Sequence, residues 1–218
     1  MAHRAADEVS RDLEHRTVVE GEVERAFFDR PVLEVAQDLV GCTVRHAGTA
    51  GVIVETEAYH HSEPACHAYV GLTARTSTLF WPPGIAYVYR SYGIHAMLNA
   101  VCEPVGVGAA VLIRALEPVE GVDLMRARRR VDRLEELCSG PGKLCQALGI
   151  GLDLNATSLL DGPIRIEPPP AGADVLELTV GRRIGITKAA ELEWRFCARG
   201  NRHVSRPRPP APGQRHAA

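Results

Sequence analysis

The sequence predicts an α+β fold, namely a single domain with a curved, mostly antiparallel β-sheet and helices packed behind it. The chain has 218 residues, which suits one domain with a sizeable buried core. Short apolar runs of strand length follow one another across turn signals, as they do in hairpins. Only two longer stretches, 31–41 and 117–137, carry helix signals. No internal repeat or second domain is evident.

The first elements follow from local signals. Residues 1–25 mix Arg and Glu without a sustained period, so we predict a flexible extension. The stretch 31–41 has Pro at its start, apolar residues at helical spacing and Gly at the C-cap position, which predicts a helix of about ten residues. The runs 42–46 and 52–59, separated by Ala-Gly-Thr-Ala-Gly, predict a hairpin.

The second strand of that hairpin carries two carboxylates and a tyrosine. Successive side chains of a strand point to opposite faces, so the strand should have one packing face and one face that presents chemistry. Glu55 and Glu57 should then lie about 7 Å apart on the same face. The packing face would hold Val52, Val54, Thr56 and Ala58, and the other face Ile53, Glu55, Glu57 and Tyr59.

A loop and an aromatic hairpin come next. Residues 60–84 lose all periodicity, and a loop of that length inside a domain is usually functional or disordered. In the following hairpin, Tyr87 and Tyr89 share a face, and Ser91-Tyr92-Gly93 forms the turn into a strand over 94–101.

The rest of the chain predicts a further strand over 107–115 with Arg114 near its end, a helix over 117–137, and a short helix over 144–148 after Ser139-Gly-Pro-Gly-Lys143. That Gly-containing loop matches a nucleotide-binding phosphate loop poorly. Three more strands are expected over 164–167, 183–188 and 194–199, and the Pro/Arg-rich tail 206–218 should be disordered. The folded domain is therefore assigned to 26–205.

Charge and cysteine usage restrict the function classes. The formal net charge of −2 argues weakly against nucleic acid. From residue 181 onward, however, the chain has nine Lys or Arg and two acidic residues, an excess of seven positive charges (nine minus two). The six cysteines form no Cys-x-x-Cys pair, which favours reduced thiols. No apolar run predicts a membrane span or a signal peptide, so we expect a cytoplasmic protein with no membrane association.

The residues alone allow more than one kind of site. The spacing of Glu55 and Glu57 resembles the carboxyl pair of an inverting glycosidase. Histidines and a cysteine gather near Glu57, but their spacing fits no zinc pattern, so we predict no metal. The members of that group are His60, His61, Cys66 and His67.

Six ordered blocks resemble the alkyladenine (3-methyladenine) DNA glycosylase family over residues 31–205. The blocks are Val-Glu-Thr-Glu57-Ala-Tyr59, Ala-Cys-His67-Ala-Tyr69, Tyr87-Val-Tyr89, Tyr92-Gly93 with Asn99, Val-Leu-Ile-Arg114-Ala-Leu-Glu-Pro118, and Leu-Cys-Ser139-Gly-Pro-Gly-Lys143-Leu. The sequence departs from the family pattern at Ala74, Thr76 and His95.

The resemblance implies a role for each matched residue. Glu57 would be the single general base, with Arg114 near the attacking water, and Glu55 would stand outside this role. Tyr59 would stack on one face of a flipped base, with His67 and Tyr89 on the other. Asn99 would reject guanine through its 2-amino group. Tyr92 would enter the duplex from a protruding hairpin, and the remaining DNA contacts would come from Tyr87, Arg75, Ser139 and Lys143.

The implied activity is monofunctional hydrolysis of the N-glycosidic bond of alkylated purines in double-stranded DNA, such as 3-methyladenine and 7-methylguanine, and also of deaminated or etheno purines. No cofactor is implied, and we expect a monomer. Two alternatives stay open. One is an O-glycoside hydrolase that uses Glu55 with Glu57, and the other is a non-catalytic module that binds single strands by stacking.

Overall fold

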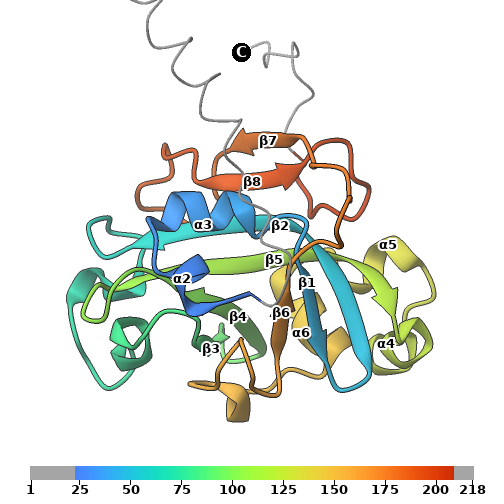
Figure 1. Ribbon diagram of the computed structural model, residues 1–218, viewed down its shortest axis with the longest axis horizontal. Coiled ribbons are helices and arrows are strands. Elements are labelled where there is room, and N and C mark those ends of the chain that lie inside the picture. Colours follow the sequence, from blue (N-terminus) through green and yellow to red (C-terminus); the bar gives the residue numbers. More distant parts are fainter. Residues whose placement is uncertain (1–22, 209–218) are drawn as a thin grey trace, which may run out of the picture.

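The computed structural model describes residues 23–208 (Figure 1). Almost all of the predicted N-terminal extension and most of the predicted C-terminal tail lie outside these residues. The described part folds around one curved sheet of eight strands, in which β3-β4-β5-β2-β1-β6 are neighbours in that order. The strand β8 pairs with β2 and β7 off this path. With helices packed on this antiparallel sheet, the predicted α+β class is confirmed.

The strand β2 (Thr49–His60) is the centre of the sheet. Along one side it pairs with β5 (Ala109–Glu120) over nearly its full length. Along the other side it pairs first with β1 (Thr43–His46) and then with β8 (Arg195–Ala198). All of these pairings are antiparallel, and Figure 1 shows β2 and β5 crossing the middle of the molecule. The backbone of β2 is therefore paired along both of its edges.

The aromatic hairpin forms one end of the sheet. It consists of β3 (Ala86–Ser91) and β4 (His95–Val101), which pair from Ala86↔Ala100 to Ser91↔His95. Its turn places Tyr92 and Gly93 at φ 49° and 72°, and Ile94 N–H bonds the Ser91 carbonyl at 3.1 Å. Two central residues with positive φ match the twist of the flanking strands. The turn leaves Tyr92 88% exposed.

The other strands are short, and the helices cover the sheet. The strands are β6 (Arg165–Glu167) and β7 (Leu178–Gly181). The helices are α2 (Arg25–Phe28), α3 (Val32–Asp38), α4 (Val122–Arg129), α5 (Leu134–Leu137) and α6 (Pro141–Leu148), with 3-10 turns η2 (His67–Val70), η3 (Ser77–Phe80) and η4 (Leu152–Leu154). Helix α3 packs on β2 and β5, whereas α6 packs on β4 and β5.

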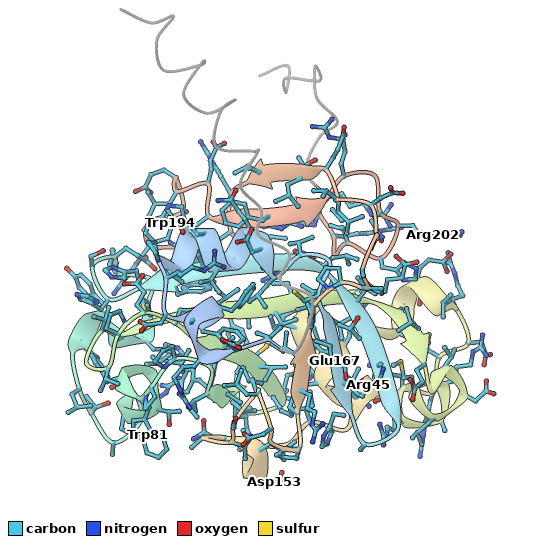
Figure 2. All side chains as sticks on the ribbon, viewed as in Figure 1. Arg45, Trp81, Asp153, Glu167, Trp194 and Arg202 are labelled. Carbon is cyan, nitrogen blue, oxygen red and sulfur yellow. The ribbon has the colours of Figure 1, made fainter. Side chains whose placement is uncertain are left out.

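Two hydrophobic clusters stabilise this arrangement. The larger one lies between the sheet and the helices and includes Phe28, Leu39, Ile113, Leu144 and Leu148, all with no exposed surface. Burying one such side chain contributes roughly 1.5–3 kcal/mol. The smaller cluster joins the loop 60–84 to the aromatic hairpin, and its buried members are Cys66, Ala68, Leu79, Tyr87, Val101 and Ala110. The outer surface carries ion pairs such as Arg45–Glu167 between β1 and β6, at 3.1 Å (Figure 2).

Gly108 explains how the loop 60–84 can lie so close to the start of β5. A Cβ at this position would come within 2.5 Å of the Ala68 Cβ and 3.0 Å of the Phe80 ring. Such a contact is shorter than carbon atoms tolerate, so a side chain here would push η2 and η3 away from the sheet. The loop predicted from lost periodicity is thus an ordered segment with two short 3-10 turns.

Several sequence predictions are confirmed and three are wrong. The helix over 31–41, the hairpin over 42–59, the aromatic hairpin and the strands near 164–167 and 194–199 are all present. The single helix over 117–137 is wrong, because β5 continues to Glu120 and two separate helices follow. The strand over 183–188 is also wrong, since its place is taken by β7 upstream. The short helix begins at Pro141, three residues before the predicted start.

The failure of the 117–137 helix has a tertiary cause. The strand β5 is extended by pairing with the start of β2, up to Ala50↔Glu120. Gly121 then turns the chain at φ 69°, where a Cβ would lie 2.2 Å from the Gly48 carbonyl oxygen. Helix α4 ends at Arg130, which is left-handed at φ 54°. Pairing and close backbone approach therefore override the local helix signals.

Three properties of the described part bear on the predicted function class. All six cysteines are buried free thiols. Among residues 23–208, no helix is long and apolar enough to cross a membrane. Within the same residues, no group of three or more His, Cys, Asp or Glu side chains could hold a metal ion.

Candidate active site

A pocket of about 270 Å³ opens between the loop 60–84, the aromatic hairpin and the segment after β7. It is smaller than the roughly 300–1,000 Å³ of sites for drug-sized ligands, so it suits a single small ring system. Of the residues that the family resemblance picks out, seven line it: Tyr59, His67, Arg75, Tyr87, Tyr89, Tyr92 and Asn99. Tyr92 does so from the hairpin turn.

Aromatic rings form one wall of the pocket. The rings of Tyr87 and Tyr89 are stacked with centroids 5.4 Å apart and an interplanar angle of 25°. His67 meets Tyr89 edge-on at 4.6 Å, and its Nδ1 lies 3.1 Å from the Tyr87 hydroxyl. Burial, and then the charge of Arg75, lower the pKa of His67, which keeps the ring neutral. The alternation of β3 and the packing of η2 thus bring these three rings together.

Asn99 has little freedom to reorient. It is 5% exposed, and its Nδ2 donates to the carbonyl of Tyr87 at 3.0 Å and to that of Met97 at 3.4 Å. Both acceptors belong to the hairpin backbone, so the amide is fixed relative to the Tyr87–Tyr89 wall. A rigid side chain in a pocket can discriminate between ligands that differ by one exocyclic group.

Glu57 lies behind Tyr59 with no exposed surface. Its Oε2 accepts from the Tyr59 hydroxyl at 2.8 Å and from Arg114 Nη1 at 3.1 Å, and its Oε1 accepts from the Ile184 N–H at 2.7 Å. A carboxylate offers about four acceptor positions, and within residues 23–208 three donors reach Glu57.

Burial raises the pKa of the Glu57 carboxyl, and the attraction of Arg114 and the Ile184 amide only partly offset this effect. Arg114 divides its guanidinium between Glu57 and Glu55. A raised pKa is typical of a base matched to neutral pH.

Glu55 has the opposite environment. Its oxygens accept from Arg114 Nε and Arg195 Nε, both at 2.8 Å, and from the Ser205 N–H at 2.7 Å and hydroxyl at 2.8 Å. Burial opposes ionisation, but the two arginines outweigh it and lower the pKa of Glu55. Three of these donors reach Oε1 and one reaches Oε2. Because two arginines hold Glu55 in the ionised form, it does not fit the paired-carboxylate role that its spacing suggested.

The structure separates the pocket wall from the carboxylates. Among the described residues that line the pocket, Tyr59 is present but Glu57 and Arg114 are not. The link between the two groups is the Tyr59 hydroxyl, which reaches from the wall to Glu57. Cys66 lines the pocket as well, but burial raises the pKa of its thiol to about 11, so it is unsuited to act as a nucleophile.

The predicted DNA-facing residues at α6 lie beside the hairpin. Lys143 is exposed in the first turn of α6, and Ser139 is bridged to Ala115 of β5. Gly142 packs against His95: a Cβ added to Gly142 would lie 2.9 Å from the Cβ of His95. His95 therefore packs against the start of α6, and it is not among the described residues that line the pocket. The start of α6 and the hairpin turn thus share one side of the molecule.

The departure from the family pattern at Thr76 stabilises its loop. Thr76 is 3% exposed, and its hydroxyl accepts from the Thr73 N–H at 2.8 Å and donates to the Gly71 carbonyl at 2.9 Å. These bonds close the turn that presents Arg75 to the pocket. Ala74, which also departs from the family pattern in this loop, is exposed.

Sequence reasoning missed four groups around the carboxylates: Arg183, the Ile184 amide, Arg195 and Ser205. The sequence showed the C-terminal part only as an excess of Lys and Arg. In the structure, Arg183 and Arg195 are 5% and 3% exposed and pair with Glu63 and Glu55. The only signal available was the excess of arginine itself, because the partners lie up to 150 positions away.

Comparison with known proteins agrees with this geometry. A family model described as Methylpurine-DNA glycosylase (MPG) matches residues 26–202. A relative from Bradyrhizobium diazoefficiens is 54% identical over 187 residues, covering 86% of this chain and 92% of its own. One from Methanoculleus marisnigri is 52% identical over 186 residues (83% and 97%), and one from Agrobacterium fabrum is 47% identical over 185 residues (85% and 93%). All three are named "Putative 3-methyladenine DNA glycosylase".

Proposed function

Since the chain belongs to the methylpurine-DNA glycosylase family, we propose that it flips damaged purines out of duplex DNA and hydrolyses their N-glycosidic bond with a water activated by Glu57. The chain is a DNA glycosylase, an enzyme of DNA repair. The observation that carries the proposed mechanism is the contrast between the donors of the two carboxylates: one arginine and two neutral groups bind Glu57, whereas two arginines bind Glu55.

In the proposed reaction the electron pair of the N-glycosidic bond leaves with the purine, and the sugar becomes oxocarbenium-like. A water oxygen then bonds to the sugar C1′ while Glu57 takes a proton from that water. The ionised carboxylate also stabilises the positive charge that develops on the sugar. Arg114, bonded to both carboxylates, holds them in place. The products are a free base and an abasic site in an unbroken strand.

The pocket supports purine lesions as substrates. Alkylation at N3 or N7 makes a purine cationic, which improves it as a leaving group and strengthens its stacking on the electron-rich rings of Tyr59 and Tyr89. 3-Methyladenine and 7-methylguanine, which are cationic in DNA, are the proposed main substrates. Hypoxanthine and ethenoadenine, which are neutral, are proposed as further substrates. The fixed amide of Asn99 is proposed to exclude unmodified guanine.

Incubation with lesion duplexes tests this proposal. Duplexes that carry 3-methyladenine, hypoxanthine or ethenoadenine are treated with the enzyme and then with alkali, which cleaves at abasic sites. We expect cleavage at the lesion only, and none in an undamaged duplex of the same sequence. An O-glycoside hydrolase would leave all duplexes intact, and a single-strand binding module would bind without turnover.

The exposed tyrosine at the hairpin turn gives a second test, because we propose that it fills the gap left by the flipped base. Tyr92→Ala should slow excision from duplex DNA by an amount that corresponds to a few kcal/mol at most. The same variant should act nearly normally on a lesion in a single strand, where no gap needs filling. Equal losses on both substrates would remove the wedge role, and Val180→Ala, at an exposed position of β7, is the control.

We also propose that no Schiff base forms. The chain has two lysines, Lys143 and Lys188, and both are exposed, whereas a nucleophilic lysine is normally desolvated. Lys143→Ala should weaken DNA binding. It should also reduce the slope of log K against log salt concentration by about one, as expected for the loss of one phosphate contact. Borohydride added during turnover should trap no covalent complex. An adduct that disappears in Lys143→Ala would overturn the water mechanism.

The active unit is proposed to be one copy of the 26–205 domain. The pocket and all donors to Glu57 come from a single chain, so one copy suffices for the chemistry. Because the substrate is genomic DNA, we propose that the enzyme works in the cytoplasm on the nucleoid.

A further inference from the structure

A buried ion pair lies one layer behind the pocket. Arg183 Nη1 donates to Glu63 Oε1 at 2.7 Å, and Nη2 donates to Glu63 Oε2 at 3.0 Å. The guanidinium also donates to the carbonyls of Ala58 at 3.0 Å and Ala189 at 3.3 Å. The two side chains are 0% and 6% exposed. This bidentate geometry fixes both the position and the plane of the guanidinium.

The same guanidinium also lies over two aromatic rings. Its central carbon lies 4.6 Å from the centroid of Tyr59 and 5.3 Å from that of Trp194, which leads into β8 (Figure 2). Tyr59 lines the pocket, but Arg183 is not among the described lining residues. Arg183 therefore contacts the Tyr59 ring from outside the pocket and supports it from behind.

The residue after Arg183 contacts the proposed general base directly. The Ile184 N–H donates to Glu57 Oε1 at 2.7 Å, and Gly185 and Ile186 line the pocket. The stretch from Arg182 to Ala189 has no helix or strand. Its backbone is therefore held by side-chain anchors, and the bonds of Arg183 to Glu63 and Ala58 tie it to the loop 60–84 and to β2.

We infer that the Glu63–Arg183 pair is a positioning unit for base excision, which sets both the Tyr59 ring and the Ile184 amide and thereby two of the three donors that hold Glu57. The inference rests on the proposed function of Glu57. Neither Glu63 nor Arg183 would touch the base or the water. They act through Tyr59 and Ile184, so they are positioning residues and not catalytic ones.

The pH dependence of excision can reveal this role. The titratable or charged groups near Glu57 are Glu55 and Tyr59 of β2, Arg114 of β5, Tyr89 of β3, Cys197 of β8 and Arg183. The Ile184 amide and the Tyr59 hydroxyl both favour the ionised carboxylate. If their positions loosen, Glu57 holds its proton more tightly, and the acid limb of the rate profile moves to higher pH.

The test uses the double variant Glu63→Gln/Arg183→Met. Changing both residues avoids leaving one buried charge unpaired, which would itself destabilise the fold. The control is Asp38→Asn/Arg30→Met, because Arg30 likewise pairs with an acid, Asp38, at 2.9 Å and stacks 4.9 Å from a ring, Phe27, away from the pocket. Excision is measured on a lesion duplex from acid to neutral pH, together with thermal unfolding.

We expect the first double variant to lose about tenfold in kcat and to shift its acid limb upward by about one pH unit. Losing one hydrogen bond to a carboxylate is expected to change the rate and the pKa by about these amounts. The control should change neither quantity. If the double variant does not stay folded at the assay temperature, the same two quantities are measured for wild type, variant and control at a lower temperature at which the variant is folded. A folded variant with the wild-type kcat and acid limb would overturn the inference.

Glu57→Gln, assayed in parallel, separates this inference from the proposed function. Retained excision in Glu57→Gln would mean that the proposed mechanism is wrong, whatever the double variant does. Loss of excision in Glu57→Gln combined with a wild-type profile in the folded double variant would leave the mechanism intact and reject only the positioning role.

Discussion

Glu57→Gln should reduce excision by about 10³-fold or more while binding to lesion DNA is retained. The amide keeps the shape of the side chain and can still accept from the Tyr59 hydroxyl, but it cannot accept a proton from water. General-base catalysis contributes about 10²–10⁴-fold, and the variant also loses the negative charge beside the sugar. Single-turnover excision and a gel-shift assay on the same duplex measure the two quantities.

The matched control is Glu117→Gln, the same substitution on β5, where Glu117 bonds Asn201 Nδ2 at 2.7 Å, outside the set of described residues that line the pocket. It should excise as the wild type does. If Glu57→Gln keeps more than about a tenth of the wild-type rate, the loss falls below the range for a general base, and Glu57 does not have that role.

The acid limb of the wild-type profile follows from the same residue. Burial raises the pKa of Glu57, and only the ionised form can accept the proton. Excision should therefore begin to fall, as pH decreases, at a pH above the ordinary glutamate value of about 4.3. Arg114→Met removes an opposing attraction and should move this limb still higher. A limb at or below pH 4 would contradict the raised pKa.

Glu55→Gln should lower the free energy of unfolding by about 3–5 kcal/mol at neutral pH, the usual cost of removing one partner of a buried ion pair. Glu55 holds Arg114, Arg195 and Ser205 together, so the variant leaves Arg195 without its buried anion. Chemical denaturation followed by tryptophan fluorescence measures the change. Glu57→Gln, measured in the same way, should lose little or no stability. The reason is that the protein stabilises the ionised carboxylate of Glu57 less than that of Glu55.

The pH dependence of stability gives an independent check on Glu55. Its pKa is lowered in the folded state, so its contribution is present above the unfolded pKa of about 4.3 and disappears as pH falls through the lower folded value. The wild type and Glu55→Gln should therefore converge in stability in acid. If Glu55→Gln is as stable as the wild type yet as inactive as Glu57→Gln, the paired-carboxylate mechanism is the better account.

The sequence by itself determined the elements whose signals are local. Pro31 is the N-cap of α3, although the helix ends at Asp38 and not at the predicted Gly41. The alternation of β2 puts Glu55, Glu57 and Tyr59 on one face, as their shared partners show. The same alternation stacks Tyr87 on Tyr89. Even here β2 departs from simple alternation, because the register shifts between Ile53 and Glu55 and both Ile53 and Val54 enter the main core.

Only the tertiary structure decided which carboxylate contacts two arginines and which contacts one. The two glutamates are two residues apart and look equivalent in sequence, but their donors come from positions 114, 184, 195 and 205. It likewise buried Arg183 and Arg195 of the basic C-terminal part, and it extended β5 through residues with helix signals. A local pattern fixes where a side chain points, whereas its pKa and its free acceptor positions depend on distant segments that pack against it.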